Sequence, residues 1–306
     1  MTRRLTAGTR ASRLAMIQTG SVLARLKEAF PSSEVTISQV TTTGDRDRRT
    51  PLHRMPGIGV FVKELEEALR DRRIDFAVHS LKDVPTVMPD GLALVAVTER
   101  LDPRDALVAG APLEDLPAGA RIGTGSLRRT VQIKEIRPDL EVVSIRGNVD
   151  TRLRKVADGE VDGAVLAAAA LARLDCTGRI VEYLPVEHFL PSPGQGALAI
   201  ESRTDDGEAN QLLAALNDPA AWRCVTAERT FLNDLGGGCS VPIAALGTIS
   251  GEVLELKGMV ADPSGGKVLR AEITGSTASP EQVGAALAQR MAEMGARELL
   301  SEVTGT

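Results

Sequence analysis

Residues 121–166 read RIGTGSLRRTVQIKEIRPDLEVVSIRGNVDTRLRKVADGEVDGAVL, and their pattern indicates the class of the fold. The apolar residues switch between short strand-like and longer helical segments, in the order 121–123, 126–136, 141–145, 150–157 and 163–166. Pro138 ends the first helical segment, because proline cannot continue a helix. Strands that alternate with helices of this length are typical of parallel α/β sheets.

The first hundred residues carry the same pattern. Strands are expected at 5–7, 35–41, 76–79 and 92–97, and helices at 12–30 and 61–70. The pattern restarts after the connection Leu101-Asp-Pro-Arg-Asp105. The restart predicts two α/β domains that follow one another along the chain.

The sequence changes in character after Pro242. Period-two alternation at 252–260 and 267–274 predicts antiparallel strands, and an apolar stripe predicts one closing helix over 280–301 with Ser279 as its N-cap. Proline and glycine mark boundaries at Leu190-Pro-Ser-Pro-Gly-Gln-Gly196 and Asn217-Asp-Pro219. We therefore predict domain 1 at 1–98 and 196–216, domain 2 at 102–191, and a small α+β domain 3 at 219–306.

Composition argues against several classes of protein. The 306 residues are 43% apolar, 25% charged and 2% aromatic with a net charge of −5, which suits a soluble globular protein and not a nucleic-acid binder. No run of about 18 apolar residues is present, so we expect no membrane span. The first residues lack the apolar stretch of a secretory signal, so we expect a cytoplasmic location. The 3 cysteines are widely spaced and there are only 3 histidines, so we expect neither disulfides nor a metal site.

Positive charge gathers where helices are expected to begin. Hydroxyl groups and guanidiniums converge in Thr9-Arg-Ala-Ser12, in Thr124-Gly-Ser-Leu-Arg-Arg129 and in Ser144-Ile-Arg-Gly-Asn-Val-Asp-Thr-Arg152. Helix N-termini favour anions, and arginine offers a bidentate fork to a carboxylate or a phosphate. A solvated face of surface arginines explains one such cluster. Three clusters at the carboxyl ends of strands favour a cleft that binds a polyanion.

Asp83 is the candidate catalytic carboxylate. It follows the strand expected at 76–79 and precedes Val84-Pro85, which places it at a strand end. An ordinary surface pair with Lys82 is the alternative that these residues leave open. His79 lies within the apolar run and is interpreted as a core histidine with a satisfied hydrogen bond.

The stretch Leu235-Gly-Gly-Gly-Cys-Ser-Val-Pro242 presents one cysteine, Cys239, after three glycines. A glycine-rich turn with an incidental cysteine is the alternative. Further motifs lie in order along the chain: Thr43-Gly-Asp45, Phe61-Val-Lys-Glu-Leu65, Val78-His-Ser-Leu-Lys-Asp-Val-Pro85, Asp102-Pro-Arg-Asp-Ala106, Arg146-Gly-Asn148, Pro193-Gly-Gln-Gly196 and Thr226-Ala-Glu-Arg229. With these motifs and the clusters above, the chain resembles the porphobilinogen deaminases, also called hydroxymethylbilane synthases, nearly from end to end.

The resemblance implies a fold and a reaction. Two α/β domains similar to periplasmic binding proteins would flank a cleft, and the third domain would present Cys239, which would hold a dipyrromethane cofactor by a thioether. The implied activity is that of a transferase of tetrapyrrole biosynthesis, which supplies porphyrins and haem. It joins four porphobilinogen molecules into hydroxymethylbilane and releases ammonia. We expect a monomer that acts on the small molecule porphobilinogen and has no nucleic-acid or membrane partner.

The resemblance also implies site residues. Asp83 would be catalytic. The cofactor would be bound by Cys239, Ser80, Lys82, Asp83, Thr124, Ser126, Arg128, Arg129, Arg146 and Gly147. The substrate would be bound by Arg10, Ser12, Gln18, Arg146, Arg152, Arg173 and Gln195.

A two-domain solute-binding protein or ligand-responsive regulator with the same clamp is the alternative from another class. It would explain the repeated α/β pattern and the arginines, but not a third domain that presents a cysteine. The charged loop at 44–59 is expected to act as a lid over the cleft or to be disordered.

Overall fold

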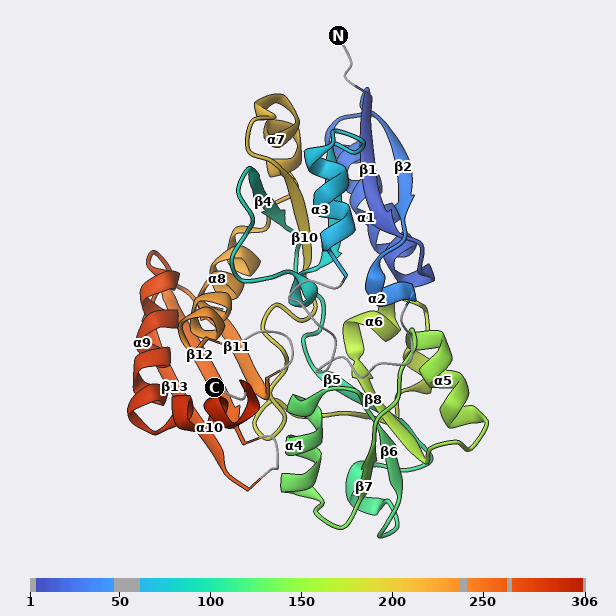
Figure 1. Cartoon of the computed structure of the whole chain (residues 1–306), viewed down its shortest axis with the longest axis vertical. Helices are drawn as coiled ribbons and strands as arrows, with labels where there is room; N and C mark the ends of the chain where they lie inside the picture. The colour runs from blue at the N-terminus through green and yellow to red at the C-terminus, as the bar shows by residue number, and fades with distance from the viewer. Residues whose placement is uncertain (1–3, 47–60, 237–240, 263–265, 305–306) are drawn as a thin grey trace. The chain divides into compact units, whose positions relative to one another are not determined.

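The structure, a computed structural model, describes residues 4–46, 61–236, 241–262 and 266–304. The chain divides into two compact units (Figure 1). Unit 1 comprises Met1–Arg48, Pro56–Leu101 and Ala197–Trp222, and unit 2 comprises Arg49–Met55, Asp102–Gly196 and Arg223–Thr306. Domains 2 and 3 of the expected division therefore share one compact unit, and the boundaries of the three domains stay a prediction. Cys239 and residues 47–59 of the expected lid lie outside the described residues.

Unit 1 contains a five-stranded sheet in the order β2-β1-β3-β10-β4. Its strands are β1 (Arg4–Arg10), β2 (Glu34–Val40), β3 (Phe76–Ser80), β4 (Leu92–Val97) and β10 (Leu198–Arg203). Its helices are α1 (Arg13–Ala29), α2 (Thr43–Arg46), α3 (Lys63–Arg70) and α7 (Gly207–Ala214), with a short 3₁₀ turn, η2 (Leu81–Asp83). β1 is parallel to β2 and β3, whereas β10 runs antiparallel to β3 and β4.

Alternating side chains of β3 divide the core of unit 1 into two layers. Phe76 and Val78 pack with α1 and α7 on one face, and Ala77 packs with α3 on the other. This follows from the period of two in a strand, which sends successive side chains to opposite faces. His79 has the same parity as Ala77 and therefore lies on the α3 face.

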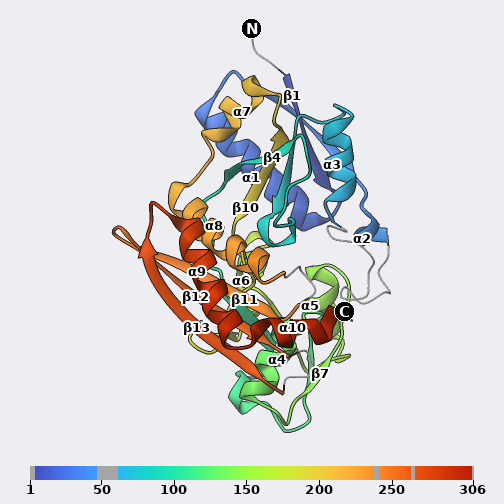
Figure 2. The same ribbon diagram turned by 60° about the vertical axis from the view of Figure 1, so that its left-hand side comes forward.

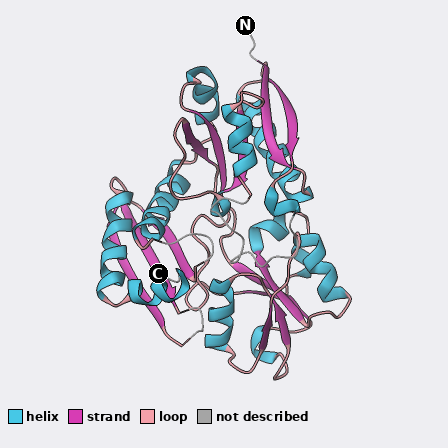
Figure 3. Ribbon diagram, in the orientation of Figure 1, coloured by secondary structure: helices cyan, strands magenta, loops and turns pink. Residues whose placement is uncertain are grey.

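The α/β part of unit 2 repeats this arrangement, with a five-stranded sheet in the order β7-β6-β8-β5-β9. Its strands are β5 (Asp105–Ala109), β6 (Arg121–Gly123), β7 (Glu141–Val143), β8 (Gly163–Ala167) and β9 (Glu182–Tyr183). Its helices are α4 (Leu127–Ile136), α5 (Val149–Ala157) and α6 (Ala168–Arg173), with 3₁₀ turns η3 (Leu113–Asp115) and η4 (Thr177–Arg179). Figure 3 shows helices flanking the strands of both α/β parts.

Both sheets are mixed, although the alternation of strands and helices predicted parallel strands. β5 is antiparallel to β8, and β10 is antiparallel to β3. Each of these two strands is the first that the chain forms after it passes from one unit into the other. No helix returns the chain to the same edge of the sheet before β5 or β10, so nothing forces a parallel strand. The prediction of two α/β domains is confirmed.

The C-terminal part of unit 2 is an antiparallel sheet, as predicted, but it has three strands in the order β11-β12-β13, where the sequence pattern indicated two. The strands are β11 (Ile243–Ser250), β12 (Val253–Ala261) and β13 (Val268–Ser276). The helices are α8 (Pro219–Asp234), whose first residues belong to unit 1, α9 (Pro280–Glu293) and α10 (Ala296–Thr304). Figure 2 shows α9 against one face of this sheet, where Leu256 and Phe231 share a core with Leu287.

The other face of the C-terminal sheet packs on the α/β part of unit 2. Leu246 and Met259 of this face form one apolar cluster with Val131 of α4 and with Leu190. The sheet is therefore anchored beside α4, the helix whose first turn contains Arg128 and Arg129.

The prediction of one closing helix over 280–301 is wrong. The chain forms two helices, α9 and α10, and Gly295 between them has a φ of +95°. That backbone conformation is costly for residues with a Cβ atom, so glycine fixes the break.

Candidate active site

In unit 1, four predicted ligands gather near the carboxyl ends of β1 and β3. Arg10 is the last residue of β1, and its guanidinium lies 4.2 Å above the ring centre of Phe61. Ser12 caps α1, since its Oγ accepts a hydrogen bond from the Ala15 amide at 3.3 Å. Buried Gln18 donates through Nε2 to Ser80 Oγ at 2.9 Å, which joins α1 to the end of β3.

Asp83 ends the η2 turn that follows β3 directly. Leu81 and Val84 are buried on either side of Lys82 and Asp83, which are both half-buried. The tight turn therefore fixes the backbone and leaves the two charged side chains at the end of the strand. The structure places Asp83 where the sequence predicted it, and its catalytic role stays a prediction.

His79 has a partner in the core, as interpreted from the sequence. Its Nε2 lies 2.8 Å from Glu201 Oε2 on the neighbouring strand β10, and both side chains are almost fully buried. Glu66 of α3 shares this environment. Burial, followed by the charge of Glu201, raises the pKa of the Glu66 carboxyl.

In unit 2, Thr124 and Ser126 shape the start of α4. Thr124 follows β6, and its Oγ1 accepts from the Ser126 amide at 3.2 Å. Ser126 then caps the helix by accepting from the Arg129 amide at 3.5 Å. The hydroxyl groups and the amides of the first turn thus meet at one point, as the sequence predicted.

Arg128 and Arg129 both pair with Asp105, a residue that the sequence pattern did not single out. Nη2 of Arg129 lies 2.6 Å from Asp105 Oδ1, and Nη1 of Arg128 lies 2.8 Å from Oδ2. Asp105 is fully buried, and the two arginines are only 4% and 6% exposed. Asp105 shares the parity of Leu107 on β5, which places its side chain on the α4 face of the sheet.

The charges in this group shift one another's pKa values. Burial alone would raise the pKa of Asp105, but the two guanidiniums outweigh burial and hold that pKa well below its ordinary value. Burial lowers the pKa of Arg128, and Asp105 partly offsets this effect. The three side chains together carry one positive charge in excess, since two cations meet one anion.

Gln195 belongs to the same group. Its Nε2 donates to Asp105 Oδ1 at 2.9 Å and to the Pro103 carbonyl oxygen at 2.8 Å. The side chain is buried with 1% exposure. In this structure the amide of Gln195 steadies Asp105, whereas its contact with substrate stays a prediction.

Gly147 bends the chain between β7 and α5. Its φ is +109°, and a Cβ atom at this position would lie 2.7 Å from Thr151 Cγ2, so both the backbone and the space require glycine. Asn148 then caps α5 through the Thr151 amide at 2.9 Å, and Arg152 Nε donates to the Gly147 carbonyl oxygen at 3.0 Å. The turn carries half-buried Arg146 beside the first turn of α5.

Arg173, the last residue of α6, is half-buried in unit 2. Its Nη2 donates to the Gly196 carbonyl oxygen at 2.8 Å, and burial lowers the pKa of the guanidinium to about 10. No carboxylate in the described part of the chain pairs with it. A partly desolvated cation without a counter-charge is suited to bind an anion.

Comparison with protein families decides the relationship. Residues 5–211 match the family model described as "Porphobilinogen deaminase, dipyromethane cofactor binding domain", and residues 222–293 match "Porphobilinogen deaminase, C-terminal domain". The chain belongs to the porphobilinogen deaminase family.

Relatives in the porphobilinogen deaminase family match almost the whole chain. The porphobilinogen deaminase of Pelobacter propionicus is 48% identical over 98% of this chain and 97% of its own length. That of Roseiflexus sp. is 47% identical over 98% of this chain and 100% of its own length. Among solved structures, a periplasmic substrate-binding protein from Coxiella burnetii covers 71% of this chain and 94% of its own at a TM-score of 0.44 and 16% identity.

The porphobilinogen deaminase motif Thr226-Ala-Glu-Arg229 contributes a second buried acid that the sequence pattern did not single out. Glu228 of α8 is fully buried. Its Oε2 accepts from the Gly194 amide at 2.7 Å, and its Oε1 accepts from the Gly247 amide at 2.7 Å. Glu228 thus ties the loop that carries Gln195 to β11 of the C-terminal sheet.

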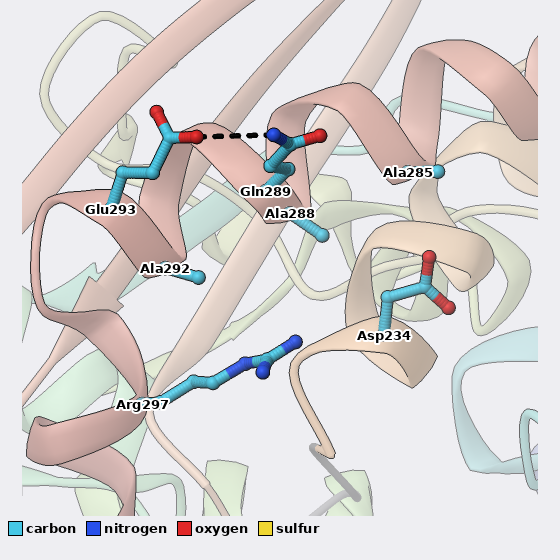
Figure 4. A pocket seen from close by; sticks show the side chains of 7 residues that line it. All are labelled: Asp234, Ala285, Ala288, Gln289, Ala292, Glu293 and Arg297. Atoms are coloured by element: carbon cyan, nitrogen blue, oxygen red, sulfur yellow. Dashed lines mark hydrogen bonds between the residues drawn. The ribbon is translucent and has the colours of Figure 1, made fainter.

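A hollow of about 490 Å³ lies between α8, α9 and α10 (Figure 4). Arg297 extends across it toward Asp234, and Gln289 donates to Glu293 at 3.1 Å. Two carboxylates and one guanidinium give this hollow an excess of negative charge. It therefore does not suit the polycarboxylate ligands of porphobilinogen deaminases.

Two kinds of feature are absent from the residues that the structure describes. No helix there is long and apolar enough to cross a membrane. No group of three or more His, Cys, Asp or Glu side chains there could hold a metal ion.

Proposed function

We propose that this chain joins four porphobilinogen molecules, head to tail, into the linear tetrapyrrole hydroxymethylbilane and releases four molecules of ammonia. The enzyme is a transferase of tetrapyrrole biosynthesis, the route to porphyrins and haem. The observation that carries the proposal is the match of 98% of the chain, at 46–48% identity, to relatives named porphobilinogen deaminase.

The charges of unit 2 fit the dipyrromethane cofactor that the family model names. Each pyrrole ring carries an acetate and a propionate, so two rings bring four carboxylates. The group of Asp105, Arg128 and Arg129 has one positive charge in excess, and Arg173 has no carboxylate partner among the described residues. Cys239 would hold the cofactor by a thioether. When bound, the cofactor supplies the pyrrole carbon to which the first substrate is joined.

Asp83 is the proposed catalytic carboxylate. Loss of ammonia from the aminomethyl group of porphobilinogen leaves a cation that the pyrrole nitrogen shares. A carboxylate held beside that N–H group stabilises the developing charge and can accept the proton that leaves as the carbon–carbon bond forms. The η2 turn supports this role because buried Leu81 and Val84 fix the backbone on both sides.

Substrate carboxylates would be bound by arginines and by uncharged polar side chains. Arginine suits this role because its planar fork binds a carboxylate through two hydrogen bonds. The proposed substrate ligands are Arg10, Ser12, Gln18, Arg146, Arg152, Arg173 and Gln195. Many arginines are needed because each added pyrrole ring brings two further carboxylates.

The proposal includes the setting of the enzyme. We propose a cytoplasmic monomer that acts on a small molecule, without a nucleic-acid or membrane partner. The net charge of −5 and the 2% aromatic content support the absence of a nucleic-acid partner.

The test is a turnover assay with porphobilinogen that measures ammonia and linear tetrapyrrole together. We expect four ammonia molecules for each tetrapyrrole, and no turnover when Cys239 is replaced by serine. Cys176→Ser and Cys224→Ser are the matched controls and should keep turnover. An active Cys239→Ser variant, or no consumption of porphobilinogen by the wild type, contradicts the proposal.

A further inference from the structure

Arg128 and Arg129 are neighbours in the sequence, but the structure gives their side chains unequal hydrogen bonds. Arg129 uses all three of its nitrogen atoms. Nε and Nη2 donate to Asp105 Oδ1 at 3.1 and 2.6 Å, and Nη1 donates to the Val165 carbonyl oxygen at 3.0 Å. Each nitrogen atom of the Arg129 guanidinium therefore donates a hydrogen bond within the protein.

Arg128 uses only one nitrogen atom. Its Nη1 donates to the Leu190 carbonyl oxygen at 2.6 Å and lies 2.8 Å from Asp105 Oδ2. In the part of the chain that the structure describes, neither Nε nor Nη2 of Arg128 has a hydrogen-bond partner. The side chain is nonetheless 96% buried, since only 4% of its surface is exposed.

Neither Nε nor Nη2 of Arg128 is among the fully buried polar atoms of the described residues, so this edge makes no protein hydrogen bond and keeps access for a ligand. The group of three charges also has one positive charge in excess, because Asp105 can neutralise only one of the two arginines. Both observations point to one missing anion, and the Nε–Nη2 edge of Arg128 has the fork geometry that a carboxylate fits.

We propose that Asp105 is a positioning residue that divides the two arginines between different tasks. It binds Arg129 as a fixed counter-charge and holds Arg128 by one nitrogen, so that the other edge of Arg128 receives a carboxylate of the cofactor. Gln195 keeps Asp105 in place through its hydrogen bond to Oδ1. This inference rests on the proposed function, because it assumes that the anion is a carboxylate of the dipyrromethane.

The experiment compares the rate of cofactor attachment in two variants of equal net charge, one that retains only Arg129 and one that retains only Arg128. Apoprotein of each variant is incubated with porphobilinogen, and intact mass records the growth of the two-pyrrole adduct on Cys239. Arg128→Met should slow attachment by about ten- to hundredfold, the effect of losing one charge-assisted contact. Arg129→Met should slow it less, because Arg128 keeps its free edge.

Adding Asp105→Asn then tests the role of Asp105. In the Arg129→Met background Asp105 has only Arg128 left to pair with and competes with the cofactor carboxylate for it, so Asp105→Asn should restore attachment by about threefold or more. In the Arg128→Met background the same change should restore nothing, although both double variants have the same net charge. Equal attachment in the two double variants, or rescue only in the Arg128→Met background, overturns the proposal.

Two controls separate positioning from folding. Asp206→Asn removes a buried acid that pairs with Arg203 at 2.9 Å in unit 1, so it should lower thermal stability without changing attachment. If a double variant does not fold, the order of the two single variants decides. Attachment that is as fast in Arg128→Met as in Arg129→Met refutes the division. A wild type without any adduct refutes the proposed function, whereas a loaded wild type with equal double variants refutes only this inference.

Discussion

Arg173 offers a prediction in which stability and activity move in opposite directions. Its guanidinium is half-buried, donates to the Gly196 carbonyl oxygen at 2.8 Å and pairs with no carboxylate of the described residues. Replacing it by methionine keeps an unbranched side chain of similar packing volume and removes the charge. The variant therefore separates the cost of burying this cation from the benefit of binding an anion.

The expected change in the free energy of unfolding of Arg173→Met follows from the pKa of the guanidinium and from the one hydrogen bond that is lost. A fall in the pKa from 12.5 to about 10 corresponds to about 3 kcal/mol against the charged form. The lost hydrogen bond from a charged donor contributed roughly 1.5–3 kcal/mol. The variant should therefore be as stable as the wild type or more stable by up to about 1.5 kcal/mol, which is at most about 5 °C in Tm for a unit of this size.

The pH dependence has a defined sign. The folded-state pKa of Arg173 lies below its unfolded value, so the charged form opposes folding at neutral pH. This opposition is relieved as the pH rises through about 10, where the folded wild type loses the proton. The advantage of Arg173→Met should therefore be largest at neutral pH and should shrink above pH 10.

The assay pairs thermal unfolding, followed by circular dichroism, with the kinetics of porphobilinogen consumption. Loss of one charge-assisted contact should lower kcat/KM by about ten- to hundredfold. Arg137→Met is the matched control, because Asp139 binds its guanidinium at 2.6 Å and backbone carbonyls bind it as well. The control should lose stability and keep its kinetics. A Tm that falls by more than a few degrees in Arg173→Met, with unchanged kcat/KM, would show that this cation serves the fold and binds no anion.

Three further predictions concern unit 1. Asp83→Asn should fold normally and lower kcat by at least about 10²–10³-fold, the usual effect of removing one aimed electrostatic group, whereas Asp83→Glu should keep more activity than Asp83→Asn. Near-normal turnover of Asp83→Asn would show that another residue is the catalytic carboxylate. The raised pKa of Glu66 means that the folded state favours the protonated carboxyl, so the stability that Glu66 contributes is lost as the pH rises above 4.5. Glu66→Gln should therefore raise Tm more at pH 8 than at pH 4, and an equal change in Tm at the two pH values contradicts this prediction. Arg10→Leu should keep the cofactor and stall particular additions, seen as covalent intermediates by mass, and a mostly apo variant would place Arg10 at the cofactor instead.

Much of the fold could be predicted because strands and helices leave different apolar periods in the sequence. β6 and β4 have the predicted bounds, and Ser12 caps α1 at the predicted start. β5 and β11 were not predicted. Their inward and outward side chains are both buried over most of their length, so the alternation that marks a half-buried strand is missing.

Only those residues of the candidate site that lie at a strand end or a helix start could be predicted from the sequence. Arg10, Asp83 and Thr124 stand where the pattern placed them, because the end of a strand is visible in the sequence. Asp105 could not be found this way. Its partner Arg129 is 24 positions away, and the pairing depends on which face of the sheet Asp105 occupies.

Gly295 shows the limit of an apolar stripe as a guide to helix length. Val283, Leu287 and Met291 are buried at helical spacing in α9, so the pattern gives no sign of an end. Glycine is tolerated within helices at a cost of about 1 kcal/mol, and only the positive φ of Gly295 shows that the helix stops there.

The intact mass of the purified protein is the sharpest test of the proposed covalent cofactor and of the reaction that depends on it. We expect the wild type to be heavier than its sequence by two pyrrole units, and Cys239→Ser to have the mass of the bare chain. Cys176→Ser and Cys224→Ser should keep the added mass. A wild type that turns over porphobilinogen without this adduct, or an adduct that persists in Cys239→Ser, would show that the cofactor is not held as proposed.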